Sequence, residues 1–525
     1  MKLDSATNNP PVLYVWRHTK QEVFMTTPTR LLARDVEWST LTKFVAHPDP
    51  HLRLGVLSGR RRVGKSYLLR ALADAMDGLY VSAVAEEGPV TARQRFAGDI
   101  ARYAGVNAAL FRADADWESL LDAAIGLTVQ RRGVSGLLII DELPYWMAHS
   151  PELPGLLQLL YDRSQTDHGH TGGRIILCGS AMSVMNNLLS GTKALRGRAV
   201  VDMRLRPFNL STTAQHWEID DPATALRLHA TLGGSPGYRN LTSHPAPQNL
   251  QEFDTWISST VLNPGQALFS RSEAEYLLRE DPQFTGSSLH YAIINAVAAG
   301  ATSPTKIGGL LERDRTSLSR PIEMLTSSGY LEQAADPLWK RRPVITVADP
   351  VIRFHNLITV PNRDLIETGA SPQAWRESQP TFVSRILGPH FEECSREWLR
   401  RHATSSILGE TRTIASTVIN DRGGRAKHEI DVIALTPGSD RATVGLIGEA
   451  KATLVRRGPA DLERLERLKT ALHDQGHDVT GARLGLFSME GFHPDLVTVA
   501  RRRGDVLLVD LPSLFDQAEP PVLPG

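Results

Sequence analysis

Short apolar segments alternate with segments of helical periodicity in the first part of the chain. Residues 52–58, 136–140 and 174–178 are mainly apolar, which predicts buried strands. Directly after the first of these segments, residues 67–73 carry apolar side chains at helical spacing. Strands and helices that alternate in this way predict an α/β domain.

The middle of the chain has a different pattern. Residues 206–281 are mostly helical in character, and an amphipathic helix is expected at 289–298. A second helix begins at Ser303, followed by a third helix and by a basic hairpin at 339–347. Short helices followed by a hairpin predict a winged helix-turn-helix, a module that either binds DNA or serves for packing and protein contacts.

The third of these helices is expected to begin at Thr316 or Ser317, with Pro321 in its first turn, where the missing N–H is tolerated. Basic and hydroxyl side chains near the start of such a helix, and on the hairpin, suit phosphate contacts. The candidate DNA-binding residues are Arg315, Ser317, Arg320, Lys340, Arg341 and Arg342.

Strands return in the last part of the chain. The pattern predicts a helix at 387–399, strands near 411–419, 428–435 and 444–451, a helix at 460–473, and strands at 484–487 and 506–509 that flank another helix. This order of elements resembles the PD-(D/E)xK nuclease core, a restriction-endonuclease-like α/β fold.

The length of 525 residues is too great for one hydrophobic core and indicates several domains. We expect an N-terminal lead-in at 1–27, a P-loop core at 28–205, a helical lid at 206–281, the winged helix at 282–360, a linker at 361–380 and the nuclease-like domain at 381–525. The formal net charge is zero, which argues against a general polyanion binder but allows local basic patches.

Cysteine content and hydropathy bear on location. The chain has 2 cysteines, Cys178 and Cys394, so no disulfide framework is expected and a reducing cytoplasm is the predicted compartment. No apolar run approaches the roughly 20 residues that span a bilayer. The N-terminus lacks the pattern of a secretion signal.

The loop at 59–66 matches the phosphate-binding pattern G-x4-G-K-S, between a predicted strand and a predicted helix. Gly59 and Gly64 permit the turn, so that successive N–H groups and the helix N-terminus face the phosphates. Lys65 is expected to reach the β- and γ-phosphates, and the hydroxyl of Ser66 to bind Mg²⁺. Most arginine side chains of the loop are expected to point to solvent. ATP and Mg²⁺ are therefore the predicted cofactors.

A second motif supports this prediction. The strand at 136–140 ends in Asp141, expected to hold the Mg²⁺ shell, and Glu142, expected to polarise the attacking water. Ser180 follows the next strand, either as a sensor of the γ-phosphate or as a helix N-cap. The candidate nucleotide-binding residues are Arg34, Gly59, Arg60, Arg61, Arg62, Val63, Gly64, Lys65, Ser66, Tyr67, Asp141 and Ser180.

Two arginines farther along, Arg196 and Arg198, are candidates for an arginine finger. Such a residue supplies positive charge to the γ-phosphate of a neighbouring subunit, which predicts a homo-oligomer. The alternative is a solvated turn without a catalytic role.

Over residues 28–360 the chain resembles the archaeal-type ATPases, prokaryotic proteins of the AAA+/STAND group. The motifs that carry the resemblance are the P-loop, Arg34-Asp35-x-Glu37, Asp141-Glu142, Cys178-Gly179-Ser180, Gly197-Arg198 and the segment 233–238. The resemblance implies that Arg34 lies near the adenine side of the nucleotide and that 233–238 belongs to the lid.

The C-terminal domain has its own candidate chemistry. Glu449 and Lys451 are two residues apart on one predicted strand, so their side chains point to the same face. Asp431 lies on the preceding strand, Glu392 can reach the same place from its helix, and Glu429 is either a further ligand or an outward ion pair. Such carboxylates can hold Mg²⁺ for hydrolysis of a phosphodiester, with the lysine orienting the nucleophile.

This segment resembles the nuclease-like domain that accompanies archaeal-type ATPases. The resemblance implies metal-binding roles for Glu392, Asp431 and Glu449 and a catalytic role for Asp431, Glu449 and Lys451. The alternative is a degenerate nuclease fold that keeps these residues as ion pairs.

Three functional hypotheses follow. The first is an ATP-dependent enzyme that couples nucleotide state to DNA binding and Mg²⁺-dependent DNA cleavage, with a role in anti-phage defence or mobile-element processing implied by the resemblance. The second is an ATP-switched DNA-binding regulator with an inactive nuclease fold. The third is a STAND-type signalling switch whose C-terminal domain senses a protein partner.

Overall fold

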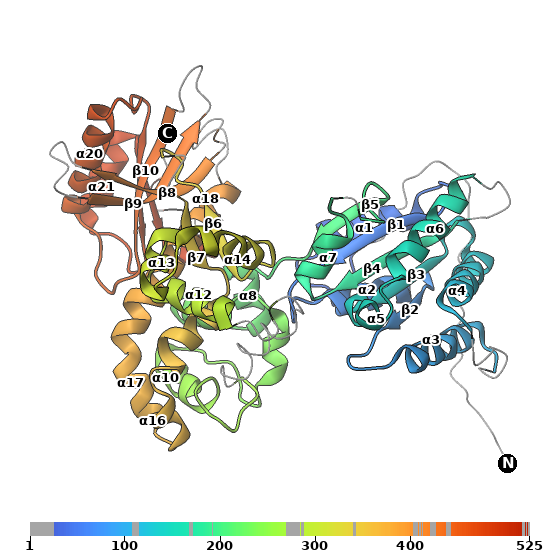
Figure 1. Cartoon of the computed structure of the whole chain (residues 1–525). Helices are drawn as coiled ribbons and strands as arrows, with labels where there is room; N and C mark the ends of the chain where they lie inside the picture. The colour runs from blue at the N-terminus through green and yellow to red at the C-terminus, as the bar shows by residue number, and fades with distance from the viewer. Residues whose placement is uncertain are drawn as a thin grey trace, which may run out of the picture.

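The computed structural model describes residues 26–107, 115–166, 172–191, 193–268, 284, 288–339, 343–402, 408, 411, 413–420, 427–436, 443–516, 520 and 522. Residues 1–25 of the predicted lead-in lie outside the described residues. The hairpin candidates Lys340, Arg341 and Arg342 also lie outside them. An N-terminal α/β part stands on one side of the molecule, and the helical and C-terminal parts stand on the other (Figure 1).

In the described part of the chain, the N-terminal sheet contains five parallel strands in the order β2-β3-β4-β1-β5. The strands are β1 (Arg53–Ser58), β2 (Leu79–Ser82), β3 (Leu137–Asp141), β4 (Arg174–Gly179) and β5 (Ala199–Arg204). The three central strands β3, β4 and β1 are buried on both faces, as central parallel strands require, whereas burial alternates along the edge strands β2 and β5.

Helices cover both faces of this sheet. One face packs against α1 (Asp35–Ala46) and α2 (Lys65–Met76). The other face packs against α3 (Pro89–Ala104), α4 (Trp117–Arg132), α5 (Leu143–His149) and α6 (Leu153–Thr166), and α7 (Met182–Leu188) follows β4. The predicted α/β core with a P-loop is therefore confirmed.

Helices follow β5. They are α8 (Leu210–Trp217), α9 (Pro222–Leu232), the 3-10 helix η3 (Pro236–Leu241) and α10 (Leu250–Ser259). The next described elements are α12 (Ser288–Ala298), α13 (Pro304–Leu311), α14 (Arg315–Ser327) and the antiparallel pair β6 (Leu331–Ala334) and β7 (Val344–Val347). The latter group has its own apolar cluster, which includes Ile293, Leu325 and Ile345.

The start of α14 differs from the expectation. Asp314, rather than Thr316 or Ser317, is the N-cap, because its carboxylate accepts hydrogen bonds from the backbone N–H of Thr316 at 2.7 Å and from its hydroxyl at 2.5 Å. The earlier start places Pro321 inside the helix instead of in its first turn. The predicted Ser303 cap of α13 is confirmed by a 3.3 Å hydrogen bond from the N–H of Lys306.

The segment expected to be a linker, 361–380, is helical. After α15 (Pro350–Phe354) and the π-helix η4 (His355–Thr359), the chain forms α16 (Arg363–Glu367) and α17 (Ser371–Thr381). Helix α17 continues directly through the π-helix η5 (Phe382–Leu387) into α18 (Gly388–His402). The expectation of a linker was wrong because few apolar side chains mark α17, although Ala374 and Trp375 are buried.

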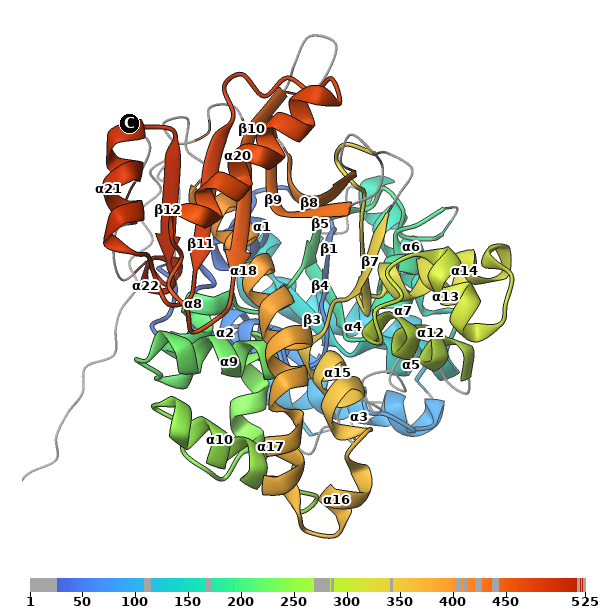
Figure 2. The same ribbon diagram turned by 90° about the vertical axis from the view of Figure 1, so that its left-hand side faces the viewer.

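The C-terminal sheet has the order β12-β11-β10-β9-β8 in the described residues. Its strands are β8 (Thr413–Asn420), β9 (Lys427–Thr436), β10 (Thr443–Lys451), β11 (Arg483–Ser488) and β12 (Val506–Asp510). β8, β9 and β10 are antiparallel, and β10, β11 and β12 are parallel. One face is covered by α20 (Pro459–Asp474) and α21 (Pro494–Arg503), and the other faces α18 and α22 (Leu511–Leu514) (Figure 2).

A continuous apolar cluster joins the helices after β5 to the C-terminal sheet. It contains Phe253 of α10, Trp375 of α17, Phe391 of α18 and Val432 of β9. The indole N–H of Trp375 also donates a 2.8 Å hydrogen bond to the carboxylate of Asp254. The predicted lid and the predicted C-terminal domain thus share one core in addition to their own contacts.

The hairpin β6–β7 is fixed to the edge of the C-terminal sheet. The hydroxyl of Thr417 in β8 donates a 2.9 Å hydrogen bond to the buried carboxylate of Asp336. The same carboxylate accepts from the backbone N–H groups of Leu338 and Trp339 at 2.9 and 3.0 Å. The turn of the hairpin is therefore organised around a residue that also holds β8.

We predict that Trp375→Ala loosens the helical part and the C-terminal sheet together. Removal of this side chain, which is 1% exposed, should cost about 3–5 kcal/mol. Hydrogen exchange followed by mass spectrometry should show faster exchange in both α10 and β9, and unchanged exchange in β1 and β4. The control Trp146→Ala, equally buried in the P-loop core, should have the reverse pattern. Loss of protection confined to α10 and α17 would contradict a shared core.

Candidate functional site

The loop between β1 and α2 has the geometry that its glycines allow. Gly64 is the N-cap of α2 and has φ of 98°, a left-handed conformation that favours glycine. A Cβ atom on Gly59 would lie 2.8 Å from the carbonyl oxygen of Leu205. The loop therefore turns tightly against the strand β5 side of the sheet and presents the N-terminus of a 12-residue helix.

Lys65 lies across this loop. Its side chain is buried, with the residue 4% exposed, and the ammonium donates a 3.2 Å hydrogen bond to the carbonyl oxygen of Arg60. Ser66 follows in the first turn of α2, and Tyr67 is 54% exposed. A buried ammonium beside a helix N-terminus favours an anion in the loop.

Asp141 and Glu142 lie at the end of β3. Asp141 is buried and accepts hydrogen bonds from the Tyr80 hydroxyl at 2.5 Å and from the N–H of Glu142 at 3.0 Å. Burial, and next the charge of Asp141, raise the pKa of Tyr80 and hold its hydroxyl as a donor. Burial and the same carboxylate also raise the pKa of Cys178 in the adjacent strand β4.

Ser180 positions Glu142. Its N–H and its hydroxyl both donate to one carboxylate oxygen of Glu142, at 3.0 and 2.8 Å. Glu142 itself has φ of 52°, a conformation that is uncommon outside glycine and directs its side chain from the strand end. The N-cap of α7 is Ala181, so the alternative role of Ser180 as that cap is wrong.

Two of the three arginines of the loop, Arg60 and Arg62, contact other protein groups, which corrects the expectation that most of them point to solvent. The guanidinium of Arg60 forms a 2.5 Å ion pair with Asp349, and lies 5.2 Å from the ring centroid of Tyr330. Arg62 lies 5.9 Å from the ring centroid of Tyr238. These contacts connect the loop to two segments that are distant in sequence, one at residues 330–349 and the other at Tyr238. In both places a protein group takes the place of water around the charged side chain.

Arg34 contacts the phosphate-binding loop near its C-terminal end, at Val63. The guanidinium donates to the carbonyl oxygens of Val63 and Arg206, both at 3.0 Å, and pairs with Glu37 at 3.2 Å. It also lies 4.6 Å from the ring centroid of Phe208. Burial lowers its pKa, while Glu37 opposes that effect. Arg34 thus ties the loop to the beginning of the helical part.

The two arginine-finger candidates differ in their freedom. Arg198 makes two 2.9 Å hydrogen bonds to the carboxylate of Asp162, which also raise the pKa of Arg198. Arg196 is exposed, and one of its nitrogens donates to the carbonyl oxygen of Gly191 at 2.6 Å. Arg196 is therefore the candidate that could more readily turn toward another subunit.

A second polar site lies where β9 and β10 meet α18. Asp431 and Glu449 are each 5% exposed, and the ammonium of Lys451 lies 3.2 Å from Asp431 and 3.0 Å from Glu449. The N–H of Ala450 donates to Asp431 at 3.0 Å, and Arg464 pairs with Glu449 at 3.2 Å. The structure thus brings Glu449 and Lys451, which the two-residue spacing placed on one face of β10, together with Asp431 of the preceding strand β9.

Glu392 joins this site from α18. Burial, and next the charge of Asp431, raise the pKa of Glu392 to about 8. Burial alone would lower the pKa of Lys451, but Asp431 and Glu449 raise it above its ordinary value. Arg396 lies 4.0 Å from Glu392, and Glu429 is exposed on β9. Three carboxyl groups, those of Glu392, Asp431 and Glu449, therefore meet with Lys451 at one buried point of the sheet.

The residues of this second site fit a divalent cation. The Oε2 atom of Glu449 is buried and has no hydrogen-bond partner among the residues that the structure describes. A buried carboxylate oxygen without a partner is costly, and a cation would satisfy it. Carboxylate oxygens are the ligands that Mg²⁺ prefers.

The candidate DNA contacts on α14 are exposed. Arg315, Ser317 and Arg320 lie near the start of the helix, and the Ser317 hydroxyl donates to the carbonyl oxygen of Asp314 at 2.7 Å. A cavity of about 810 Å³ lies between the first turns of α13 and α14 and the edge of β8 and β9. Arg315 and Lys427 are among the residues that line it, so this groove has basic groups on both walls.

Several site residues could not be identified from their local sequence. Tyr80 and Tyr330 belong to no recognisable motif. Arg464 lies in a helix with many charged residues, and its local sequence does not distinguish it from them. The Asp349-Pro350 pair was visible in the sequence, but only the fold brings Asp349 to Arg60.

No protein-family model and no curated protein matches this sequence. Among solved structures, a Walker-type ATPase of Pyrococcus abyssi is similar with 18% identity and a TM-score of 0.45, over 64% of this chain and 99% of that chain. The ORC2 protein of Aeropyrum pernix has 14% identity and a TM-score of 0.39, over 68% and 97%. A STAND protein with a tetratricopeptide repeat sensor from Pyrococcus horikoshii has 14% identity and a TM-score of 0.26, over 71% and 50%.

In the part of the chain that the structure describes, no helix is both long enough and apolar enough to cross a membrane.

The Arg60–Asp349 pair leads to a stability prediction. Asp349→Asn keeps an oxygen that can accept from the N–H of Ile352, but leaves the guanidinium of Arg60 without its counter-charge. Loss of one partner of a buried pair costs about 3–5 kcal/mol, so Tm should fall clearly in scanning calorimetry. The control Asp162→Asn breaks the more exposed pair with Arg198 and should cost about 1 kcal/mol or less. Equal shifts in Tm for the two variants would show that the Arg60 pair is not a strong link.

Proposed function

We propose that this chain binds and hydrolyses ATP and that nucleotide state controls a Mg²⁺-dependent nuclease in its C-terminal domain. The observation that carries the ATPase proposal is the position of Glu142. Two hydrogen bonds from Ser180 fix this carboxylate at the carboxyl edge of the sheet. The loop that follows β1 at the same edge leads to Lys65, the first residue of α2. A phosphate loop with an oriented carboxylate beside it is the arrangement that nucleotide hydrolysis needs.

In this proposal, Lys65 and the backbone N–H groups of 59–66 bind the β- and γ-phosphates. Ser66 and Asp141 would hold Mg²⁺, which neutralises charge on the phosphates when it is bound. Glu142 orients a water molecule for attack on the γ-phosphorus and accepts its proton. Release of ADP and phosphate follows.

Arg196 is proposed to complete the site of a neighbouring subunit in a homo-oligomer. Arg196 suits this role better than Arg198, because Arg196 is exposed and has a single backbone contact, whereas Arg198 is paired with Asp162. Positive charge near the γ-phosphate stabilises the transition state of phosphoryl transfer.

Contacts from the phosphate loop support transmission of the nucleotide state to the rest of the chain. The N–H of Gly237 donates to the carbonyl oxygen of Arg62 at 3.0 Å, and Arg60 pairs with Asp349. The side chain of Asn186, after β4, donates to the carbonyl oxygen of Ser327 in α14 at 3.0 Å. A movement of the loop around bound phosphates would therefore change these contacts and shift the lid and the winged helix.

We further propose that residues 381–525 are a PD-(D/E)xK nuclease-like domain and that 282–360 is a DNA-binding winged helix. The element order from α18 to β12 and the grouping of Asp431, Glu449 and Lys451 support the first assignment. Asp431, Glu449 and Glu392 would hold Mg²⁺, which lowers the pKa of a water molecule when it is bound. Lys451 orients the nucleophile and balances negative charge that develops on the phosphate.

The groove between α14 and the β8–β9 edge supports DNA as the substrate. Basic groups on both walls, Arg315 and Lys427, suit the phosphates of a nucleic acid. Arg320, and the hairpin arginines and lysine beyond the described residues, would add to these contacts.

A second candidate function is an ATP-switched DNA-binding regulator or STAND-type signalling switch with an inactive nuclease fold. The observation in its favour is the cationic neighbourhood of the carboxylates. Lys451 contacts both Asp431 and Glu449, and Arg464 adds a second cation to Glu449. A site that is neutralised in this way has less need of a metal ion.

For the ATPase, we predict that Glu142→Gln lowers the rate of phosphate release by about 100-fold to 10,000-fold, because a general base is lost. Binding of a fluorescent ATP analogue should remain, since Lys65 and the loop are unchanged. The control Glu152→Gln changes an exposed carboxylate after α5 and should keep the wild-type rate. Hydrolysis at an equal rate in Glu142→Gln would sink the assigned role of Glu142.

For the nuclease, we predict that plasmid DNA is cut in the presence of Mg²⁺ and that Asp431→Asn reduces cutting to background. The control Glu490→Gln alters an exposed carboxylate after β11 and should cut like wild type. ATP and Mg²⁺ are varied independently, with EDTA as the blank. Equal cleavage by wild type and Asp431→Asn would reject the nuclease and leave the regulator or signalling switch, while ATP hydrolysis would remain a separate readout.

A further inference from the structure

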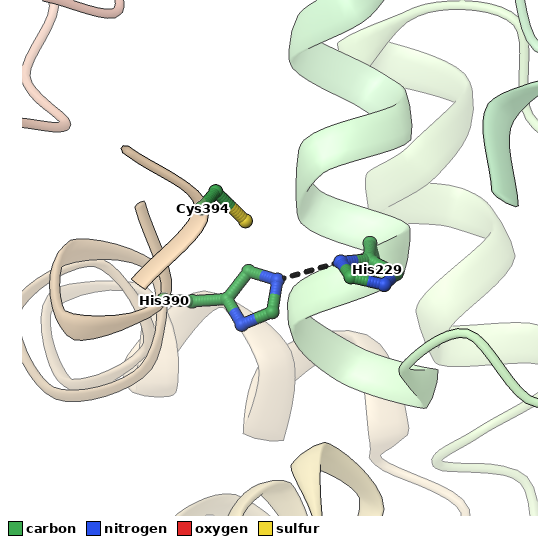
Figure 3. A group of neighbouring side chains, drawn as sticks. All are labelled: His229, His390 and Cys394. Atoms are coloured by element: carbon green, nitrogen blue, oxygen red, sulfur yellow. Dashed lines mark hydrogen bonds between the residues drawn. The ribbon is translucent and has the colours of Figure 1, made fainter. Parts of the chain in front are cut away.

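A buried group of nitrogen and sulfur ligands lies between α9 and α18. His229 belongs to α9, and His390 and Cys394 are one helical turn apart on α18 (Figure 3). All three are buried, and one ligand atom from each lies within 4.8 Å of the others. The Nδ1 atom of His229 is 2.8 Å from the Nε2 atom of His390.

The outer side of His229 shows which nitrogen is available. Its Nε2 atom lies 3.3 Å from the carbonyl oxygen of Phe208, an atom that can only accept a hydrogen bond. Nε2 must therefore carry the proton, and Nδ1 presents a lone pair toward His390 and Cys394. Histidines that bind metals are oriented in this way, with the distal N–H given to a backbone carbonyl.

Charges of both signs lie around the group. Arg353, Arg396 and Arg401 bring positive charge near it, and Glu393 and Glu397 bring negative charge. A divalent cation that bound here would displace the thiol proton of Cys394 and would be partly neutralised by the resulting thiolate.

We propose that His229, His390 and Cys394 form a binding site for one Zn²⁺ ion. Imidazole nitrogen and thiolate sulfur are the ligands that Zn²⁺ prefers, whereas Mg²⁺ prefers oxygen. On binding, the hydrogen bond between the two rings is replaced by two nitrogen–metal bonds, and the proton of His390 Nε2 moves to the other nitrogen of that ring. Three protein ligands leave one tetrahedral position for a further ligand.

The position of this site gives it a structural consequence. Helix α9 ends at the N–H of Gly233, which donates to the carbonyl oxygen of His229 at 2.9 Å, and leads into the segment that contacts Arg62. On α18, Glu392 of the acidic site lies between His390 and Cys394 in sequence. A cation here would clamp the helix that leads to the phosphate loop to the helix that carries Glu392.

Cobalt substitution tests the proposal on the full-length chain without a histidine tag. Co²⁺ is titrated in the presence of excess Mg²⁺, which fills oxygen sites. We expect a thiolate-to-cobalt charge-transfer band that saturates at one equivalent and is abolished by one equivalent of Zn²⁺. The band should be lost in Cys394→Ser and kept in Cys178→Ser, which alters the only other cysteine of the sequence.

Wild type alone can overturn the proposal, because absence of the charge-transfer band in the folded protein rules out a thiolate ligand. Persistence of the band in Cys394→Ser overturns it as well. Should Cys394→Ser fail to fold, His229→Gln provides the second variant, for which a loss of the band and of the Zn²⁺-dependent rise in Tm is expected. Neither ATP hydrolysis nor DNA cleavage enters these readouts, so the zinc proposal fails or stands independently of the proposed function.

Discussion

The apolar core that joins the lid helices to the C-terminal sheet determines how the rest of the molecule is organised. Phe253, Trp375 and Val432 belong to three elements far apart in sequence, yet they share one cluster. Burial of large apolar side chains stabilises by about 1.5–3 kcal/mol each, so these elements are held more firmly than hydrogen bonds at a domain boundary could hold them. The second acidic site is built on this core, since α18 contributes Phe391 to the cluster and Glu392 to the carboxylates. The P-loop part has separate cores and contacts this body mainly through polar groups.

Electrostatics supply the specificity that the apolar core lacks. Three buried charges of the candidate sites have defined partners: Lys65 with a loop carbonyl, Arg60 with Asp349, and Lys451 with Asp431. Unpaired charges would be costly in these places, so the pairs fix the positions of the loops and strands that bear them. A ligand that brings phosphate or a cation must compete with these pairs. Binding and rearrangement are therefore coupled by the same charges.

Local chemistry explains how much the sequence could predict. The G-x4-G-K-S loop and the Glu449–Lys451 spacing depend only on residues a few positions apart, and the structure has both in the expected elements. The start of α14 was misplaced because Asp314 and Thr316 are both good caps, and only the geometry shows which carboxylate or hydroxyl accepts. The helix at 371–381 was missed because Pro380 and many polar residues conceal the face that Trp375 buries. Contacts such as His229 with His390, separated by 161 residues, leave no local pattern at all.

The hairpin held by Asp336 has a further consequence for the molecule in a crowded solution. β8 ends the strand order of the C-terminal sheet, and an edge strand offers unpaired backbone groups to which a foreign strand can add. Thr417 of β8 is bonded to Asp336, and the partly buried Leu338 packs against the core beneath the sheet. The hairpin therefore shields a stretch of this edge, as charged or covered edges do in other β-sheet proteins, and protects the protein against edge-to-edge aggregation.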